Sequence, residues 1–174
     1  MIKKGLVHIY TGDGKGKTTA AIGLALRARG ANLSVLVAQL FKEKNSEAKS
    51  LEKLGIAYLN YSTKHPFFKK YSEKELASEA EKCIFFVKRV FEMVRIKSYD
   101  LIVLDEIGPA LAYNLVKEDE LAEMIKSKPG KTELVMTGRG FPESIIKLAD
   151  YVTEMRKVRH PYDKGVNARK GIEH

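Results

Sequence analysis

A glycine- and lysine-rich stretch near the start of the chain has the residue types that bind phosphate: Tyr10-Thr11-Gly12-Asp13-Gly14-Lys15-Gly16-Lys17-Thr18-Thr19. Glycines let backbone N–H groups turn inward around an anion, and the N-terminus of a following helix adds a partial positive charge. Lys17 would reach the phosphates, and the Thr18 hydroxyl would ligate Mg²⁺. The stretch therefore predicts a loop that binds the polyphosphate of a nucleotide.

Two features of this loop depart from the usual pattern, which is G-x-x-x-x-G-K-S/T. The first glycine of that pattern falls at Thr11, and Gly12 follows one place later. Asp13 is also unusual, because a carboxylate beside polyphosphate is repulsive unless it contacts a hydroxyl or a metal. A glycine-rich surface turn is the alternative, but the apolar run at 6–10 and the helical pattern at 20–29 favour the phosphate loop.

The second group of candidate residues is the acidic pair Asp105 and Glu106. The pair directly follows the apolar run Leu101-Ile102-Val103-Leu104. Two desolvated carboxylates side by side need a cation. A phosphate-loop threonine and an acid at the end of a strand together hold the Mg²⁺ of a nucleotide. We therefore expect Thr18, Asp105 and Glu106 on the metal side of the site. Which acid is the direct ligand stays open, as does the alternative of a helix-capping Asp105 and a solvated Glu106.

A third candidate segment, Thr137-Gly138-Arg139-Gly140, follows the apolar run at 133–137. A glycine lets the backbone approach a ligand closely, and an arginine can bind phosphate oxygens through two N–H groups. Arg139 is therefore a candidate phosphate ligand. The alternative for Arg139 is a surface ion pair.

These segments need a scaffold that brings them together, and the rest of the sequence predicts one. Strand and helix patterns alternate from end to end. The expected strands are 6–10, 33–40, 55–61, 101–104, 133–137 and 151–158, and the expected helices are 20–29, 46–54, 72–97, 118–127 and 142–150. This alternation predicts an α/β fold, with a mostly parallel sheet and helices on both faces. Ligands bind beyond the carboxyl ends of such strands, where all the candidate residues fall.

Composition limits the remaining possibilities. The 174 residues suit one domain, 1–174, and no apolar run approaches the length of a membrane span. No signal peptide is evident, so we expect a cytoplasmic protein without membrane contact. The single cysteine, Cys83, excludes an internal disulfide. The net charge of +9 is spread along the chain, which favours a solvated lysine-rich surface over nucleic-acid binding.

Taken together, the segments resemble the CobA/BtuR/CobO-type corrinoid adenosyltransferases. The matching segments are 10–21, 103–106, 137–140, 153–156 and the tail 159–173, and a phosphate loop without the first glycine is itself a feature of that family. The segment Gln39-Leu40-Phe41-Lys42-Glu43 departs from it by lacking the Lys-Gly that many members carry. Because the sequence begins just before the first strand, we also expect no N-terminal extension of the kind that some members fold over the active site.

The resemblance implies a P-loop NTPase-like (RecA-like) fold and a transferase. Its members move the 5′-deoxyadenosyl group of ATP to the cobalt of reduced cob(I)alamin or another corrinoid and release triphosphate, with Mg²⁺ as cofactor. Lys17 and Glu106 are then the catalytic candidates. Phe67 and Phe68 are candidates for contact with the corrinoid, with an anchoring role in the loop as their alternative. The residues expected at the ATP are Gly12, Asp13, Gly14, Lys15, Gly16, Lys17, Thr18, Thr19 and Arg139.

The resemblance also implies a reductase or flavodoxin as electron donor, and a homodimer. Two other functions fit parts of the sequence. A phosphoryl-transferring or ATP-hydrolysing enzyme would use Glu106 to orient water or an acceptor hydroxyl. A nucleotide-dependent nucleic-acid binder would use the basic surface and would show a steep dependence of affinity on salt.

Overall fold

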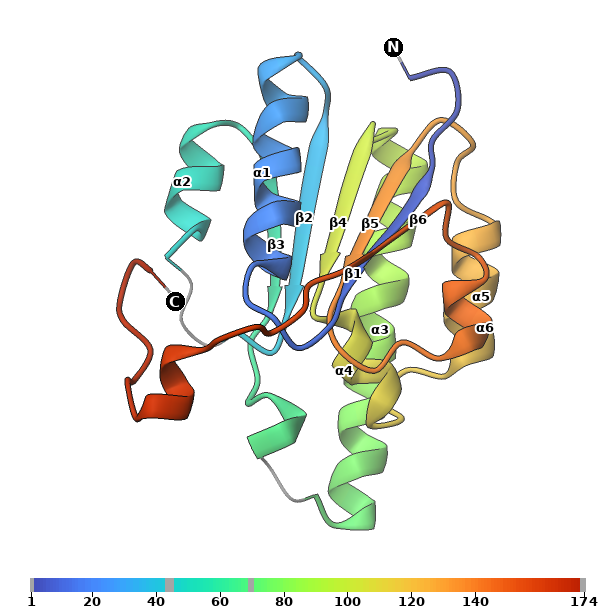
Figure 1. The fold of residues 1–174 in the computed structure, drawn as a ribbon. Helices are drawn as coiled ribbons and strands as arrows, with labels where there is room; N and C mark the ends of the chain where they lie inside the picture. Colours follow the sequence, from blue (N-terminus) through green and yellow to red (C-terminus); the bar gives the residue numbers. More distant parts are fainter. Residues whose placement is uncertain (1, 43–45, 69–70, 173–174) are drawn as a thin grey trace.

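The computed structural model describes residues 2–42, 46–68 and 71–172. Within these residues, strands and helices alternate along the chain (Figure 1). The strands are β1 (Val7–Thr11), β2 (Val35–Leu40), β3 (Ala57–Tyr61), β4 (Leu101–Asp105), β5 (Glu133–Thr137) and β6 (Tyr151–Glu154). The helices are α1 (Lys17–Gly30), α2 (Ala48–Lys53), α3 (Glu73–Lys97), α4 (Ile107–Ala112), α5 (Glu118–Lys126) and α6 (Glu143–Ile146), with short 3-10 helices η1 (Pro66–Phe68) and η2 (Pro161–Lys164).

The strands form one parallel sheet in the order β3-β2-β4-β5-β1-β6. β5 lies between β1, which leads into the phosphate loop, and β4, which ends at Asp105 just before Glu106. All strand arrows in Figure 1 point the same way, so the carboxyl ends gather at one edge. The start of α1 lies at this edge too. The predicted α/β class is confirmed, and this topology is that of a P-loop NTPase-like fold.

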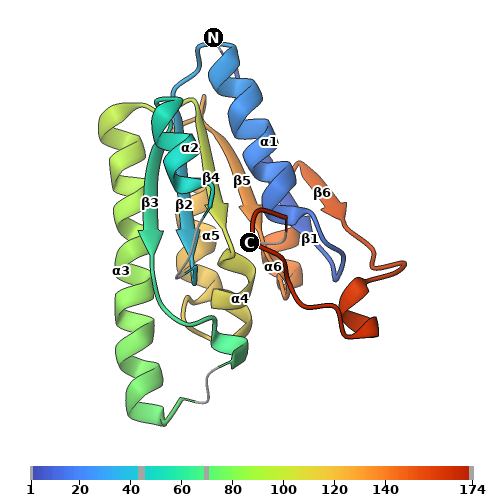
Figure 2. The ribbon, with the colours of Figure 1, turned by 90° about the vertical axis from the view of Figure 1, so that its left-hand side faces the viewer.

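Side chains of successive strand residues point to opposite faces of the sheet, and each face has its own core. Val35, Val37 and Val103 pack with α1 and α2 on one face. Leu36, Ala38 and Leu104 pack with α3, α4, α5 and α6 on the other. Figure 2 shows α3 and α1 on opposite sides of the sheet. The all-buried strands β2 and β4 are mostly apolar because helices cover them on both faces.

Helix α3 forms as the capping box predicts. The Glu75 N–H donates to Ser72 Oγ (3.3 Å), and the Ser72 N–H donates to Glu75 Oε2 (2.9 Å). The apolar stripe of the helix is buried, including Cys83 and Val87. None of the helices in the described part of the chain is both long enough and apolar enough to cross a membrane.

Two expected boundaries were wrong, and one helix had not been expected. The segment 107–112 forms helix α4, where no helix was expected. Its Gly108-Pro109 pair is typical of a turn, although proline is accepted in the first turn of a helix. Helix α6 ends at Ile146 rather than 150, because the chain rejoins the sheet where the Asp150 N–H donates to the Val7 carbonyl (2.8 Å). Strand β6 ends at Glu154 rather than 158, because the next residues turn beneath the phosphate loop.

Candidate functional site

The phosphate loop joins β1 to α1 and packs against the chain just beyond β6. The Gly14 N–H donates to the Met155 carbonyl (2.6 Å). A Cβ atom at Gly12 or Gly14 would lie 2.6 Å from the same carbonyl oxygen. Gly12 and Gly16 also have φ angles of 92° and 115°, in the region that favours glycine. The glycines of the loop are therefore required both by its turns and by its contact with Met155.

Lys17 begins α1, and its side chain is almost fully buried inside the loop. Its Nζ donates to the carbonyl oxygens of Gly12 (2.7 Å) and Gly14 (2.8 Å). Burial, followed by the nearby positive charge of Arg139, lowers the pKa of Lys17 below its usual value. The ammonium group is thus held by two carbonyl oxygens of the phosphate loop.

Asp105 is fully buried at the end of β4 and is fixed by the two neighbouring strands. It accepts hydrogen bonds from Gln39 Nε2 (2.9 Å) on β2 and from Thr137 Oγ1 (2.6 Å) on β5. The register of the sheet pairs Gln39 directly with Asp105. The Thr137 hydroxyl also accepts from the Glu106 N–H (3.0 Å), so one side chain positions both acids.

Glu106 lines the cavity beside the phosphate loop. Asp105 does not line this cavity and is fully buried. The backbone of Glu106 has φ 63°, an uncommon conformation outside glycine that turns the chain sharply into α4. His65 Nε2 lies 3.8 Å from Glu106 Oε2. Burial alone would raise the pKa of Glu106, but the nearby His65 side chain and the charge of Lys42 outweigh it and lower the pKa. Glu106 is therefore held as a carboxylate.

Lys42, just beyond the end of β2, links the loop to the acids. Its Nζ donates to Thr18 Oγ1 (3.2 Å) and lies 3.2 Å from Asp105 Oδ2. Burial would lower the pKa of Lys42, but attraction to Asp105 and Glu106 outweighs it and raises the pKa. Lys42 is therefore a cation between the predicted metal ligands.

Arg139 lies on the other side of the loop. Its Nη2 donates to the Asp13 carbonyl (2.9 Å), and its Nε lies 3.3 Å from Asp13 Oδ1. Both side chains are exposed and both residues line the cavity. The unusual carboxylate of Asp13 therefore contacts an arginine instead of facing phosphate unaccompanied.

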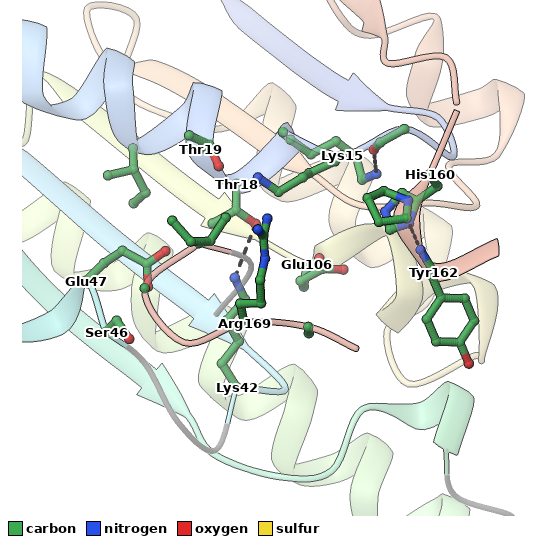
Figure 3. A pocket seen from close by; sticks show the side chains of 18 of the residues that line it. Lys15, Thr18, Thr19, Lys42, Ser46, Glu47, Glu106, His160, Tyr162 and Arg169 are labelled. Carbon is green, nitrogen blue, oxygen red and sulfur yellow. Dashed lines mark hydrogen bonds between the residues drawn. The ribbon is translucent and has the colours of Figure 1, made fainter. Parts of the chain in front are cut away.

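A cavity of about 780 Å³ contains most of the predicted residues (Figure 3). Its walls come from the phosphate loop and the start of α1, from the segment around α2, and from the C-terminal tail. The predicted residues that line it are Asp13, Gly14, Lys15, Gly16, Lys17, Thr18, Thr19, Glu106 and Arg139. Figure 3 shows Lys42, Thr18 and Arg169 close together, with His160 and Tyr162 on the tail.

The two predicted corrinoid contacts lie elsewhere. Phe67 is exposed on η1 and does not line the cavity, and its N–H donates to His65 Nδ1 (3.2 Å). Phe68 ends η1, and its side chain lies outside the described residues. The structure thus brings the predicted ATP residues together and leaves the aromatic pair as a prediction.

The donor set at the expected metal position is chemically suitable for Mg²⁺. It consists of the Thr18 hydroxyl and the carboxylates of Asp105 and Glu106, and hard oxygen ligands are those that Mg²⁺ prefers. The described residues contain no group of three or more histidine, cysteine or acidic side chains that could bind a metal alone. The remaining ligands would come from water and phosphate, as is usual for nucleotide-bound Mg²⁺.

Sequence reasoning did not assign roles to several residues that complete this site: Gln39, Lys42, Met155, Tyr162 and Arg169. One signal was available, because Gln39 is a polar residue in a fully buried apolar strand and such groups need hydrogen-bond partners. The contact of Met155 with the loop depends on sheet order and has no local signal.

Comparison with known proteins agrees with this geometry. The sequence model of the family described as ATP:corrinoid adenosyltransferase BtuR/CobO/CobP matches residues 3–174. The corrinoid adenosyltransferase CobA of Salmonella typhimurium is 34% identical over 174 residues, and the corrinoid adenosyltransferase of Escherichia coli is 33% identical over 174. Each alignment covers 99% of this chain and 87% of the relative.

A solved structure, the flagellar accessory protein FlaH from Methanocaldococcus jannaschii, has a TM-score of 0.57 with this chain at 18% identity. The match covers 88% of this chain and 72% of that chain, and it supports the fold alone. The sequence matches show the family as well as the fold, because they span nearly every residue that lines the cavity. The chain belongs to the ATP:corrinoid adenosyltransferase family BtuR/CobO/CobP.

Proposed function

We propose that this protein transfers the 5′-deoxyadenosyl group of ATP to the cobalt of a reduced corrinoid and releases triphosphate, in adenosylcobalamin biosynthesis or salvage. One observation carries the proposal: a phosphate loop, an acid-ended strand and Arg139 meet at one cavity in a chain that matches the family over residues 3–174. The two substrates are ATP and the corrinoid.

The chemistry asks the protein for positioning rather than for a nucleophile. The cobalt(I) electron pair forms the bond to C5′ of the ribose, the C5′–O bond breaks, and its electron pair leaves on the triphosphate. The cobalt becomes formally cobalt(III), so atoms and electrons balance without a further reactant. The corrinoid carries the reactivity, while the protein aligns the two substrates and stabilises the departing charge.

The phosphate loop is the part of the site suited to the leaving group. Its backbone amides, Lys15 and Lys17 would bind the triphosphate, and Arg139 would add a further positive charge from the other side of the loop. Lys17 would exchange its bonds to the loop carbonyls for bonds to phosphate oxygens. Because these interactions strengthen as negative charge develops, they favour the transition state.

We assign the metal to Thr18, Asp105 and Glu106. Bound there, Mg²⁺ would neutralise charge on the triphosphate oxygens. Thr137 and Gln39 would keep Asp105 in place, and Glu106 would reach the metal or its water ligands from the cavity. The oxygen-only donor set supports this assignment.

The corrinoid is proposed to bind over η1, where Phe67 offers an exposed aromatic surface beyond the cavity. The Phe67→Ala variant should then raise KM for cobalamin and leave KM for ATP unchanged. An equal effect on both values, or none, would contradict this assignment.

Cobalt(I) is strongly reducing, so the reaction needs an electron donor. We propose a reductase or flavodoxin as that partner, the cytoplasm as the location, and a homodimer as the assembly. Light scattering during size-exclusion chromatography would test the dimer, and reduction of cobalamin by a purified flavodoxin system in the presence of the protein would test the donor.

The decisive experiment is an absorbance assay with ATP, Mg²⁺ and chemically reduced cobalamin. Formation of adenosylcobalamin, with triphosphate as the other product, is expected. No absorbance change from the folded protein would overturn the proposal. Rapid release of ADP and phosphate without corrinoid would instead support the ATP-hydrolysing alternative.

A further inference from the structure

Lys42 lies between Thr18 and Asp105, two of the three residues assigned to the metal. It follows β2 at the carboxyl edge of the sheet, and its side chain extends back toward α1 and β4. Its ammonium nitrogen lies 3.2 Å from Thr18 Oγ1 and 3.2 Å from Asp105 Oδ2. The dashed line between Lys42 and Thr18 in Figure 3 marks this contact. One positive charge thus bridges the hydroxyl and the carboxylate.

The surroundings explain why a cation is needed there. Asp105 is fully buried, and an ionised carboxylate without a counter-charge is costly to bury. Gln39 and Thr137 satisfy its oxygens with hydrogen bonds but bring no charge. Lys42 supplies the compensating charge in the protein without nucleotide.

A metal ion and this ammonium group cannot share the position. Mg²⁺ binds oxygen at about 2.0–2.1 Å, so an ion held by Thr18 and Asp105 would fall within contact distance of Lys42 Nζ. Two positive charges at that distance repel each other strongly. The Lys42 side chain has room to change its position. It is 25% exposed and lines the cavity where the triphosphate is expected.

We propose that Lys42 holds the metal position in the nucleotide-free protein, and that it moves onto the triphosphate when Mg²⁺ enters with ATP. Metal alone is therefore a poor ligand, because it must displace Lys42 from its contact with the buried Asp105 carboxylate. Metal and triphosphate bind cooperatively, because the triphosphate receives the displaced ammonium. The inference rests on the metal site proposed above.

The test measures Mn²⁺ binding by electron paramagnetic resonance, first without nucleotide. Lys42→Met and Lys42→Gln remove the charge, and Gln keeps a hydrogen-bond donor in case the Met variant does not fold. Lys53→Met is the matched control, because it removes one exposed positive charge from α2 away from the cavity lining. We expect Mn²⁺ to bind the two Lys42 variants about tenfold more tightly than the wild type or the control, as removal of a like charge at contact distance implies.

A second series adds inorganic tripolyphosphate. The gain in Mn²⁺ affinity caused by tripolyphosphate should be large in the wild type and in Lys53→Met, and clearly smaller in the Lys42 variants. Unchanged metal affinity in folded Lys42→Gln without nucleotide would overturn the inference, as would an undiminished gain with tripolyphosphate.

Asp105→Asn separates this inference from the metal site on which it rests. If Asp105→Asn leaves Mn²⁺ binding with tripolyphosphate unchanged, the assigned metal site is wrong, and the inference falls with it. If Asp105→Asn weakens binding while the Lys42 variants behave as the wild type does, only the role of Lys42 is refuted.

Discussion

The Thr137 hydroxyl holds both acids of the site, so its removal should be costly. We consider Thr137→Val, which replaces the hydroxyl by a methyl group of nearly the same shape and leaves no cavity. The hydroxyl donates to Asp105 Oδ1 at 2.6 Å and accepts from the Glu106 N–H at 3.0 Å, and the Thr137 side chain is fully buried. The variant therefore removes two hydrogen bonds and fills the space with an apolar group.

The size of the effect follows from these two bonds. Loss of a hydrogen bond to a charged group costs about 1.5–3 kcal/mol, and a buried N–H left without a partner costs about 1–3 kcal/mol. The two losses share one atom and are not additive, so we expect Thr137→Val to lower the free energy of unfolding by about 3 kcal/mol. Thr137→Ser keeps the hydroxyl and loses one methyl group, which costs about 1 kcal/mol.

Urea unfolding at pH 7, followed by circular dichroism, measures both variants against the wild type. The difference between them, about 2 kcal/mol, isolates the hydroxyl from the loss of packing. Thr137→Val should also weaken Mn²⁺ binding with tripolyphosphate, because Asp105 loses one of the groups that fix it. Equal stability of the Val and Ser variants would refute this account of how the acids are held.

Three further predictions concern other parts of the chain. Gly14→Ala should abolish ATP binding in calorimetry, because its Cβ would lie 2.6 Å from the Met155 carbonyl, whereas Gly130→Ala, with no atom within 4 Å, should bind normally. Asp100 has a pKa lowered by its hydrogen bonds from the backbone and side chain of Ser34, so its stabilising effect is complete above the ordinary carboxyl pKa and is lost as pH falls through the lower folded value. Urea unfolding of Asp100→Asn should thus show a deficit of about 1 kcal/mol at pH 7 that shrinks below about pH 4, and a constant deficit would contradict it. Burial raises the pKa of Cys83 to about 12, so a thiol reagent at pH 8 should label it only after denaturation, and rapid labelling of the native protein would show that α3 opens readily.

Local patterns predicted the parts of the site that are continuous in sequence. The phosphate loop is recognisable because its glycines, Lys17 and Thr18 are consecutive and lie between a strand and a helix. Asp105 and Glu106 are recognisable because two acids end an apolar strand. The sheet order then brings both to one edge, as parallel α/β folds require.

The parts that were missed depend on contacts between distant residues. In the sequence, nothing distinguishes Lys42 from the other lysines expected at the surface. The parallel pairing of β2 with β4 places it beside Asp105. The turn of Met155 beneath the loop follows from the pairing of β6 with β1, which no local pattern specifies. Helix α4 was missed because glycine and proline together usually indicate a turn.

The place of β1 in the sheet has a consequence for the order in which the protein can be made. Although β1 precedes the other strands of the described sheet, it pairs in that sheet with β5 and β6, which follow all of them in sequence. During synthesis β1 cannot pair with its neighbours in the sheet until β5 and β6 have been translated. Its apolar residues stay uncovered until then. Contacts between such distant segments form slowly and leave a nascent chain open to aggregation. The nucleotide site can therefore be completed only after β5 and β6 have been translated, although the phosphate loop directly follows β1.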